Sequence, residues 1–487
     1  MKTIKRTITG MVFEDYQAGD IPQLERKTSV FDKLYHKFVP TGGFMLGDSF
    51  ATYNIDENFL HHAVIGTPYA NCSIEDIPMS EGLPTKPYRS NIKLQKHQKD
   101  VFERISADNP QIFLNIPTAT GKTVLSVHRI AKLQVKTIII CFKKKILYQW
   151  YETFRDKTDI DINRVMIIDS SQYFLDLING SIEPEETDIW LVTPNLINSF
   201  CSHNGWEVLY DLFEFMGIGF KVFDEAHRCF ATTVKINAHT STRTLYLSAD
   251  CMQANPDVRK LYFDALRDAI LIRYDKETLE NLKHITCVQY EYSSFPTLED
   301  TAAVTNMARK NKYHWDHFNF TRYYMDNGIV VNHVLNVLNE IIKNEPVLPK
   351  TKPYKILILT NMIDAVDMVY REIKTKINER SVSRYHTKIE KTESLRYLSA
   401  DIIVSTYQAF AEGVDVTNPK IKHVISMNPV DPILANQAAG RCRPIEGEDS
   451  FFWMMVDKGF SYCLHNELKV AQYLTNSKIG KIIRIDG

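Results

Sequence analysis

The sequence predicts an α/β protein with two parallel-sheet domains in tandem, preceded by a small N-terminal accessory domain. The chain has 487 residues, of which 44% are hydrophobic, and this exceeds what one hydrophobic core usually holds. Apolar, strand-like runs alternate with helical segments from Leu94 to about Ile272, and a second alternation begins near His284. Such alternation is typical of βαβ units, which build parallel sheets.

The first segment, residues 1–90, mixes aromatic, glycine and charged residues without a long period. The Gly42-Gly43 pair and the stretch from Phe44 to Tyr53 indicate a small mixed or β-rich module. The stretch from Pro84 to Pro87 is typical of a boundary. We therefore expect an accessory domain over residues 1–90, for which DNA binding is one role to consider.

The first parallel-sheet domain is expected over residues 91–283. Its predicted strands are short apolar runs, each followed by a helical segment or a turn. They are Ile112–Leu114, Thr137–Cys141, Ile189–Val192, Val222–Phe223 and Leu245–Leu247.

The second domain is expected over residues 284–487, with strands near Lys355–Leu359, Asp401–Val404, His423–Ile425 and Phe451–Met454. An aromatic and basic insertion lies near residues 295–345. Its stretch from Arg309 to Tyr324 suits stacking on unpaired bases. A buried helical face is the favoured interpretation, because aromatic residues near helical spacing are usually core. A helix is predicted over Val330–Ile342.

A phosphate-binding loop is indicated between the run Ile112–Leu114 and a helical segment that starts at Val124. Gly121 lets backbone amides approach phosphates, Lys122 reaches the outer phosphates, and the Thr123 hydroxyl can ligate magnesium. The full pattern has glycine five positions before Gly121, where this chain has isoleucine, so the motif is shortened, and a chance loop is the alternative. The predicted nucleotide-binding residues are Pro117, Thr118, Ala119, Thr120, Gly121, Lys122 and Thr123.

An acidic pair ends the later strand-like run. Asp224 and Glu225 follow Val222–Phe223, so their carboxylates are expected at the carboxyl edge of the sheet, where open α/β folds bind ligands. Asp224 can hold the magnesium ion, and Glu225 can orient and deprotonate an attacking water. A solvated acidic turn is the weaker interpretation, because the pair follows Lys122 and Thr123 in the right order. The two motifs together predict hydrolysis of a nucleoside triphosphate.

Composition restricts the partners and the compartment. The formal net charge of −1 requires any contact with nucleic acid to come from a local basic surface. The eight cysteines include no Cys-x-x-Cys pair, which favours reduced core residues over zinc ligands or disulfides. The chain start lacks a secretion signal, and no run approaches about eighteen apolar residues. We expect a soluble cytoplasmic protein without a membrane partner.

In their order, these motifs resemble the superfamily 2 helicases with an Asp-Glu-Ala-His box, here Asp224 to His227, and among them the phage branch-migration helicases of the UvsW type. The resemblance covers roughly residues 92–456. It implies two RecA-like domains, ATP and Mg²⁺ as cofactors, DNA as partner, a catalytic role for His227, and the host cytoplasm if a phage encodes the chain. The oligomeric state stays open, with a monomer favoured.

Further roles in the first domain come from the resemblance. Gln98 matches the glutamine that reads the adenine edge, for which an amide both donates and accepts. The strand Thr137–Cys141 and the following helix match segments that meet the nucleic-acid backbone. This chain has Lys143 and Lys144 where the family usually has Pro-Thr. Lysines can bind phosphates of the nucleic-acid backbone. A run of solvated charges at the start of a helix is a nearly equal alternative. Thr193 matches another strand contact.

The stretch Leu247–Asp250 resembles the coupling motif that commonly contains Ser-Ala-Thr. Asp250 replaces the hydroxyl residue, which leaves the coupling between hydrolysis and unwinding open.

In the second domain, Thr406 and the segment with Gly413 and Asp415 resemble the motif that contacts nucleic acid and nucleotide. Gln437, Arg441 and Arg443 resemble the arginine-finger helix, and a guanidinium there can stabilise the transferring phosphoryl group by about a thousandfold or more. The family spacing places the second arginine where Pro444 stands, so Arg441 and Arg443 are both predicted without a ranking.

The resemblance therefore implies an ATP-dependent DNA helicase or translocase that unwinds or branch-migrates single-stranded, forked or branched DNA in replication and recombination. One alternative is an RNA helicase, which shares the phosphate chemistry and differs in its sensitivity to the 2′-hydroxyl. Another is a nucleic-acid-stimulated ATPase that acts as a switch without unwinding, which Asp250 makes plausible.

Overall fold

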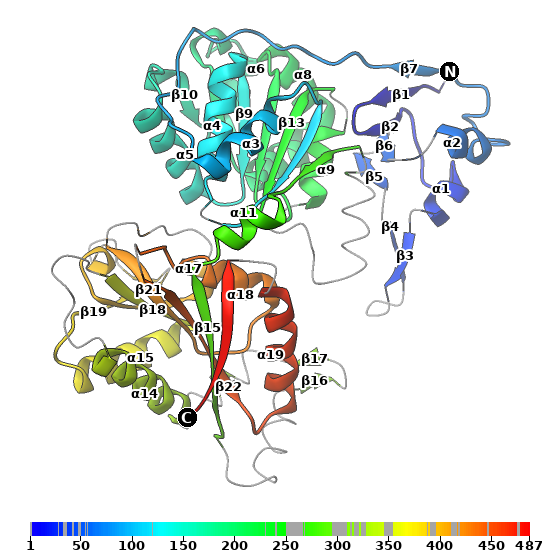
Figure 1. Cartoon of the computed structure of the whole chain (residues 1–487). Helices are drawn as coiled ribbons and strands as arrows, with labels where there is room; N and C mark the ends of the chain where they lie inside the picture. The colour runs from blue at the N-terminus through cyan, green and yellow to red at the C-terminus, as the bar shows by residue number, and fades with distance from the viewer. Residues whose placement is uncertain are drawn as a thin grey trace. The chain divides into compact units, whose positions relative to one another are not determined.

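The chain forms two compact units, Met1–Tyr274 and Asp275–Gly487 (Figure 1). The computed structural model describes residues 2–27, 29–32, 37–40, 43–46, 50–53, 55, 57–118, 120–228, 230–238, 241–249, 266, 268–294, 309–311, 314–315, 321–322, 328–344, 354–386, 388–389, 396–410, 416, 419–445, 448–474 and 478–487.

The first unit begins with a small module around a five-stranded sheet in the order β5-β6-β2-β1-β7. Strand β1 pairs antiparallel with β2 and parallel with β7. The core of the module is aromatic: the ring of Phe13 contacts Tyr16, Tyr53 and Tyr69 at centroid distances of 5.2–6.1 Å. The elements are β1 (Ile4–Thr7), β2 (Gly10–Phe13), α1 (Pro22–Lys27), β3 (Ser29–Asp32), β4 (Lys37–Pro40), β5 (Gly43–Leu46), β6 (Phe50–Tyr53), α2 (Glu57–Ala63) and β7 (Ile74–Asp76).

A seven-stranded parallel sheet in the order β10-β11-β9-β12-β13-β8-β14 forms the rest of the first unit. Helices α6 to α9 pack on one face, where Trp190, Phe223 and Tyr246 belong to a common apolar cluster. Helices α3, α4 and α5 pack side by side. The elements are α3 (Lys96–Ser106), β8 (Gln111–Asn115), α4 (Lys122–Leu133), β9 (Thr137–Cys141), α5 (Lys144–Lys157), β10 (Val165–Ile167), α6 (Gln172–Ile178), β11 (Ile189–Val192), α7 (Pro194–Asn204), α8 (Trp206–Phe215), β12 (Phe220–Asp224), α9 (Phe230–Asn237), β13 (Arg243–Ser248) and β14 (Ile270–Ile272).

The segment that joins the module to the sheet, residues Ser80–Asn91, is here called the strap. It runs past the amino ends of the central strands: its backbone exchanges hydrogen bonds with Lys136, just before β9, and with Ser241, just before β13. Gly82 has φ +68°, and a Cβ at this position would lie 2.2 Å from the Cα of Gly219. The stretch Pro84–Pro87, predicted as a boundary, lies inside this hydrogen-bonded strap.

The turn between β1 and β2 provides a second attachment of the module. The hydroxyl of Thr9 donates to the Asn237 carbonyl at 3.1 Å, and that of Thr7 donates to the Ala238 carbonyl at 3.2 Å. The Asn237 side chain in turn accepts from the ammonium of Lys221 at 3.1 Å and donates to the Tyr246 hydroxyl at 2.8 Å. A buried polar network therefore links the turn to strand β12.

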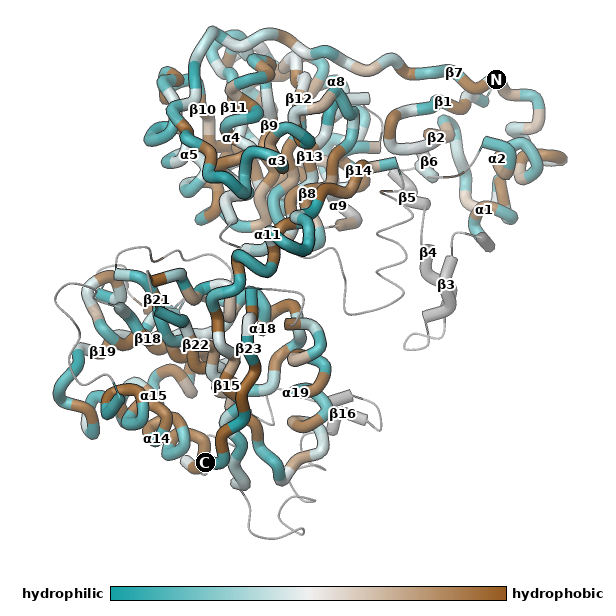
Figure 2. Tube along the Cα trace, in the orientation of Figure 1, coloured by the Kyte–Doolittle hydropathy of each residue, from teal (hydrophilic) through white to brown (hydrophobic). Residues whose placement is uncertain are grey.

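The second unit contains another seven-stranded parallel sheet, in the order β19-β20-β18-β21-β22-β15-β23. Helices α14 and α15 pack on one face of the sheet, and α18 and α19 contribute to the cluster on the other. Hydrophobic strands lie at the centre of both units, whereas α3 and α5 carry hydrophilic stretches (Figure 2). The elements are α11 (Lys276–Asn281), β15 (Ile285–Tyr292), α14 (Ile329–Asn344), β18 (Tyr354–Thr360), α15 (Ile363–Lys376), β19 (Val382–Tyr385), β20 (Ile402–Thr406), α17 (Tyr407–Phe410), β21 (Lys420–Ser426), α18 (Pro432–Ala439), β22 (Ser450–Asp457), α19 (Ser461–Leu474) and β23 (Ile479–Asp486).

The predicted fold class is confirmed: two all-parallel sheets follow a small N-terminal sheet. In the insertion, β16 (Arg309–Asn311) and β17 (His314–Trp315) form an antiparallel pair, and most of the stretch up to Tyr324 lies outside the described residues. The six cysteines of the described ranges are free, and five of them are buried. Within the same ranges, each helix is too short or too polar to span a membrane.

Candidate active site

The phosphate loop follows β8 and leads directly into α4. Gly121 caps the helix with φ 95°, a backbone conformation that glycine adopts at little cost. The Thr120 hydroxyl donates to the Pro117 carbonyl at 2.7 Å, and the Lys122 ammonium donates to the Ile116 carbonyl at 3.3 Å. The loop is thus folded back on its own carbonyls. The first amides of a helix attract anions, so the start of α4 suits a phosphate group.

The remaining predicted loop residues lie between β8 and the first turn of α4. Lys122 is buried, and Thr123 lies partly buried in the first turn of α4. Pro117 and Thr118 follow the carboxyl end of β8. Ala119 lies outside the described residues.

Gln98 supports the phosphate loop from α3. Its side-chain oxygen accepts from the Gln95 amide at 2.9 Å, and its side-chain nitrogen donates to the Thr120 carbonyl at 3.0 Å. The side chain is buried, and a Cβ added to Gly121 would lie 2.4 Å from its nitrogen. These contacts hold the glutamine against the loop. Its role in reading adenine stays a prediction.

Asp224 ends strand β12 and is held by two N–H donors. The indole of Trp150 donates to Oδ2 at 2.9 Å, and the backbone amide of Glu225 donates to Oδ1 at 3.0 Å. Burial and the neighbouring Glu225 charge raise the pKa of Asp224 to about 6, while the indole, Lys122 and the amide act in the opposite direction. A nearby cation would favour the charged carboxylate further.

Glu225 has an unusual conformation for a residue with a side chain. Its φ is +51°, a left-handed backbone that costs roughly 1–2 kcal/mol outside glycine. Its Oε2 atom is buried, has no hydrogen-bond partner within the part of the chain that the structure describes, and lies 3.4 Å from Nδ1 of His227. The same Nδ1 is hydrogen-bonded to the Ser248 hydroxyl at 2.8 Å. The acidic pair is thereby connected to the end of β13.

The donor set fits a magnesium ion. Mg²⁺ prefers oxygen ligands and usually takes only one or two carboxylates from the protein, and the Asp224 carboxylate and the Thr123 hydroxyl are of that kind. The buried Oε2 of Glu225, which has no hydrogen-bond partner among the described residues, leaves acceptor positions that suit a water or an ion at this site. Thr123 and Asp224 are the residues that would hold the ion.

Two contacts of this site were not predicted as part of it. Trp150 lies in the helix after Thr137–Cys141, which the resemblance assigns to nucleic-acid contact, and Ser248 lies in the stretch that resembles the coupling motif. Trp150 lies on the buried face of α5 with Leu147 and Phe154, a spacing that predicts a core residue. No sequence signal indicates that its N–H reaches Asp224.

The predicted nucleic-acid residues of the first unit follow the carboxyl ends of β9 and β11. Lys143 caps α5, and its ammonium lies 5.8 Å from the centroid of the Phe142 ring. Lys144 is exposed and pairs with Asp169 at 3.5 Å. Thr193 caps α7 by accepting from the Leu196 amide at 3.4 Å.

In the second unit, Thr406 ends β20 and accepts from the Ala409 amide at 3.2 Å. Gln437 is buried on α18, and Arg441 and Arg443 follow the end of that helix. One guanidinium nitrogen of Arg443 donates to the Gly440 carbonyl at 3.1 Å. Gly413 and Asp415 lie outside the described residues, as does Asp250 of the coupling motif.

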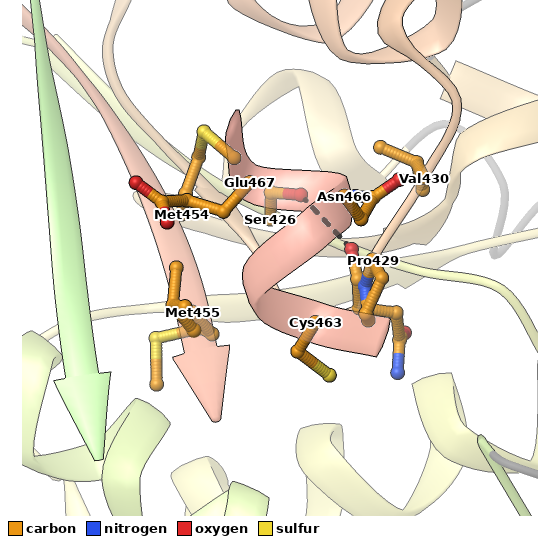
Figure 3. Close-up of a pocket in the computed structure, with 10 residues that line it drawn as sticks. Ser426, Pro429, Val430, Met454, Met455, Cys463, Asn466 and Glu467 are labelled. Atoms are coloured by element: carbon orange, nitrogen blue, oxygen red, sulfur yellow. Dashed lines mark hydrogen bonds between the residues drawn. The ribbon is translucent and has the colours of Figure 1, made fainter. Parts of the chain in front are cut away.

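A small cavity lies beside the carboxyl ends of β21 and β22, with Ser426, Pro429, Met454, Cys463 and Glu467 around it (Figure 3). The Ser426 hydroxyl donates to the Asn428 carbonyl at 3.4 Å. The buried Glu467 carboxylate accepts from the Arg484 guanidinium at 3.2 Å. None of the predicted site residues lines this cavity. Its lining residues pack against one another at the edge of the sheet.

One family model matches a part of the chain. Residues 91–252 match the family model described as "Type III restriction enzyme, res subunit". No curated protein matches the chain.

Among solved structures, Mss116p bound to single-stranded RNA and AMP-PNP is 15% identical with a TM-score of 0.51, and the match covers 81% of this chain and 75% of that one. Dbp5 of S. cerevisiae, bound to RNA and ADP BeF3, is 12% identical with a TM-score of 0.49 over 80% and 89%. The Hef helicase domain of Pyrococcus furiosus is 14% identical with a TM-score of 0.44 over 77% and 97%.

The chain shares with Mss116p the fold of two tandem RecA-like domains, and the family match covers most of the first parallel sheet.

Proposed function

We propose that the chain is an ATP-hydrolysing, Mg²⁺-dependent motor that acts on nucleic acid. One observation carries this proposal: a fixed Asp224 carboxylate, within electrostatic range of Lys122, lies next to a buried Glu225 oxygen without a hydrogen-bond partner. That combination supplies a cation for phosphates, a metal ligand and a base for water.

The residues of the first unit would share the work of hydrolysis. The first amides of α4 and Lys122 bind the outer phosphates, and Thr123 and Asp224 hold the metal. An ion held there would neutralise charge on the phosphate oxygens. Glu225 orients the attacking water and takes its proton. The hydrogen bond between His227 and Ser248 connects the acidic pair to the end of β13, so a displacement of one would affect the other.

The second unit carries the residues proposed to supply positive charge to the transferring phosphoryl group. Arg441 and Arg443 are the proposed fingers, and Gln437 supports them from α18. Gly413 and Asp415 are proposed nucleotide contacts on the resemblance alone. Guanidinium groups spread their charge over planar donors, which suits the equatorial oxygens of a transferring phosphoryl group.

DNA is the proposed nucleic acid, in single-stranded, forked or branched form, with branch migration in replication and recombination as the task. The resemblance to phage helicases of the UvsW type supports this choice. Lys143, Lys144, Thr193 and Thr406 are the proposed backbone contacts. RNA is the alternative, since Mss116p and Dbp5 are described as bound to it, and the 2′-hydroxyl distinguishes the two.

The test of this function compares ATP turnover and strand separation on single-stranded DNA, a fork, a four-way junction, linear duplex and RNA. We expect turnover to be stimulated by single-stranded DNA and strand separation to occur on forks or junctions. Stimulation of ATP turnover by RNA but not by DNA would identify RNA as the nucleic acid. Turnover that no nucleic acid changes would overturn it, and stimulation without any strand separation would identify a switch.

Glu225→Gln isolates the proposed base. The amide keeps the shape of the side chain but cannot accept the proton of the attacking water, so turnover should fall by about a hundredfold or more. Binding of a fluorescent ATP analogue should stay within about twofold of the wild type. Equal loss of binding and turnover would instead show that Glu225 acts on nucleotide affinity.

A further inference from the structure

Helix α5 connects two parts of the proposed machinery. It begins next to Lys143 and Lys144, and its buried face carries Trp150, whose side chain is fully excluded from solvent. Seven residues separate Lys143 from Trp150, which is two helical turns or about 10 Å along the axis. The same short, rigid element therefore contains the proposed phosphate contacts and the indole that donates to Asp224 at 2.9 Å.

The indole hydrogen bond determines how the Asp224 carboxylate is presented. One oxygen accepts the Glu225 amide and the other accepts the Trp150 indole, so the plane of the carboxylate is fixed from both sides. A carboxylate has about four acceptor positions, and those that remain are available to a cation. Without the indole N–H, Oδ2 would lose its hydrogen bond from Trp150, and the carboxylate could rotate toward other partners.

The same two segments meet at a second point. The Phe142 ring, just before α5, lies 5.9 Å from the Arg228 guanidinium and 5.8 Å from the Lys143 ammonium. Arg228 directly follows His227, so the loop before α5 touches the far end of the acidic motif. A displacement of α5 would therefore act on both ends of residues 224–228.

We propose that Trp150 is a positioning residue that couples the start of α5 to Asp224, so that nucleic acid bound at Lys143 and Lys144 changes how the site holds Mg²⁺ and nucleotide. The coupling rests on the proposed function above, whereas the alignment of Asp224 by the indole does not require nucleic acid. The indole acts through the carboxylate and needs no contact with the nucleotide.

Trp150→Phe in the full chain removes the N–H and keeps an aromatic side chain in the core. Trp190→Phe is the matched control, because Trp190, on strand β11 of the same unit, is equally buried and donates its indole N–H to the Tyr173 hydroxyl at 3.2 Å. Two quantities are measured: the Mg²⁺ concentration for half-maximal binding of a fluorescent ATP analogue, and kcat and KM for ATP with and without single-stranded DNA.

For Trp150→Phe we expect the half-maximal Mg²⁺ concentration to rise by about tenfold, the size of effect for a hydrogen bond to a charged group. We also expect the stimulation of kcat by DNA to fall severalfold, with KM for ATP at saturating Mg²⁺ nearly unchanged. Trp190→Phe should change neither quantity. A folded Trp150→Phe protein with the Mg²⁺ dependence and DNA stimulation of the wild type would overturn the proposal.

Failure of the proposed function has a different signature. If the wild type shows no stimulation by DNA or RNA, the motor proposal fails, and the Mg²⁺ dependence of analogue binding still tests the alignment by Trp150. If Trp150→Phe does not fold, Phe142→Leu tests the second contact point outside the core. Reduced stimulation in Phe142→Leu supports the coupling through α5, and wild-type stimulation overturns it.

Discussion

Lys221 is a fully buried lysine on β12, three residues before Asp224. Its ammonium donates to Asn237 at 3.1 Å and lies 5.7 Å from the centroid of the Phe213 ring. Burial lowers the pKa of Lys221 to about 7. In the unfolded chain the pKa returns to its ordinary value, so the folded state binds this proton less tightly.

Lys221→Met should therefore change the pH dependence of stability. Between pH 7 and about 10, Lys221 holds a proton in the unfolded wild type but has released it in the folded state. The contribution of Lys221 to the free energy of unfolding therefore rises with pH over this range, and it is lowest below pH 7. The advantage of the methionine variant in the free energy of unfolding should be largest at pH 7 and shrink by up to about 1.4 kcal/mol per pH unit above it. Urea denaturation from pH 6.5 to 9.5 measures this, and a difference that stays constant with pH contradicts it.

The sequence predicts those site residues whose chemistry depends on a local pattern. Lys122, Asp224 and Glu225 are identifiable because a phosphate loop and an acidic strand end have short, ordered signatures. Trp150 is not, because its contact with Asp224 joins residues that are distant in the chain. The positive φ of Glu225 likewise has no signature in residue type, since glycine would be the expected residue there.

At the scale of elements, the strap depends on two glycines that approach each other closely. Gly82→Ala would place a methyl group 2.2 Å from the Cα of Gly219 at φ +68°, and Gly180→Ala is the matched control with φ +70° and nothing within 4 Å. The shared conformation should cost each variant roughly 1–2 kcal/mol. The steric conflict should add about 1–3 kcal/mol to Gly82→Ala alone.

Thermal or urea unfolding of the two variants compares these costs directly. Equal destabilisation of Gly82→Ala and Gly180→Ala would show that the strap can shift away from Gly219 without a loss of stability. The contact between Gly82 and Gly219 would then contribute nothing to the free energy of unfolding.

Continuous apolar runs make most strands predictable. Thr137–Cys141 and Ile189–Val192 match β9 and β11 because these central strands are buried on both faces. The edge strand β23 was not predicted, since most of its residues are exposed or partly exposed and its pattern lacks an apolar run. Its parallel pairing with β15 follows from the tertiary fold.

At the scale of the whole molecule, the proposed mechanism assigns the arginine finger to Arg441 or Arg443 of the second unit. Replacement of the finger by alanine should lower kcat by about a thousandfold, and replacement of the other arginine should lower kcat less. Steady-state turnover of Arg441→Ala and Arg443→Ala measures both effects, and direct titration with the ATP analogue controls for nucleotide binding. Wild-type kcat in both variants contradicts the assignment.

The tandem architecture was predictable from the repeated alternation of strands and helices, whereas the attachment of the first module was not. Thr7 and Thr9 are ordinary turn residues in the sequence, yet their hydroxyls bind the carbonyls of Ala238 and Asn237. Such contacts depend on surfaces that form only after both partners fold, so no local pattern contains them.

The left-handed backbone at Glu225 has a consequence for how this protein tolerates change. A glycine there would relieve the conformational cost and remove a buried oxygen that makes no hydrogen bond to the described residues. Glu225→Gly should therefore give a more heat-resistant protein that no longer turns over ATP. At this position, a substitution that increases the stability of the fold therefore decreases the proposed catalytic activity. Selection of variants for stability alone would therefore favour proteins that do not turn over ATP.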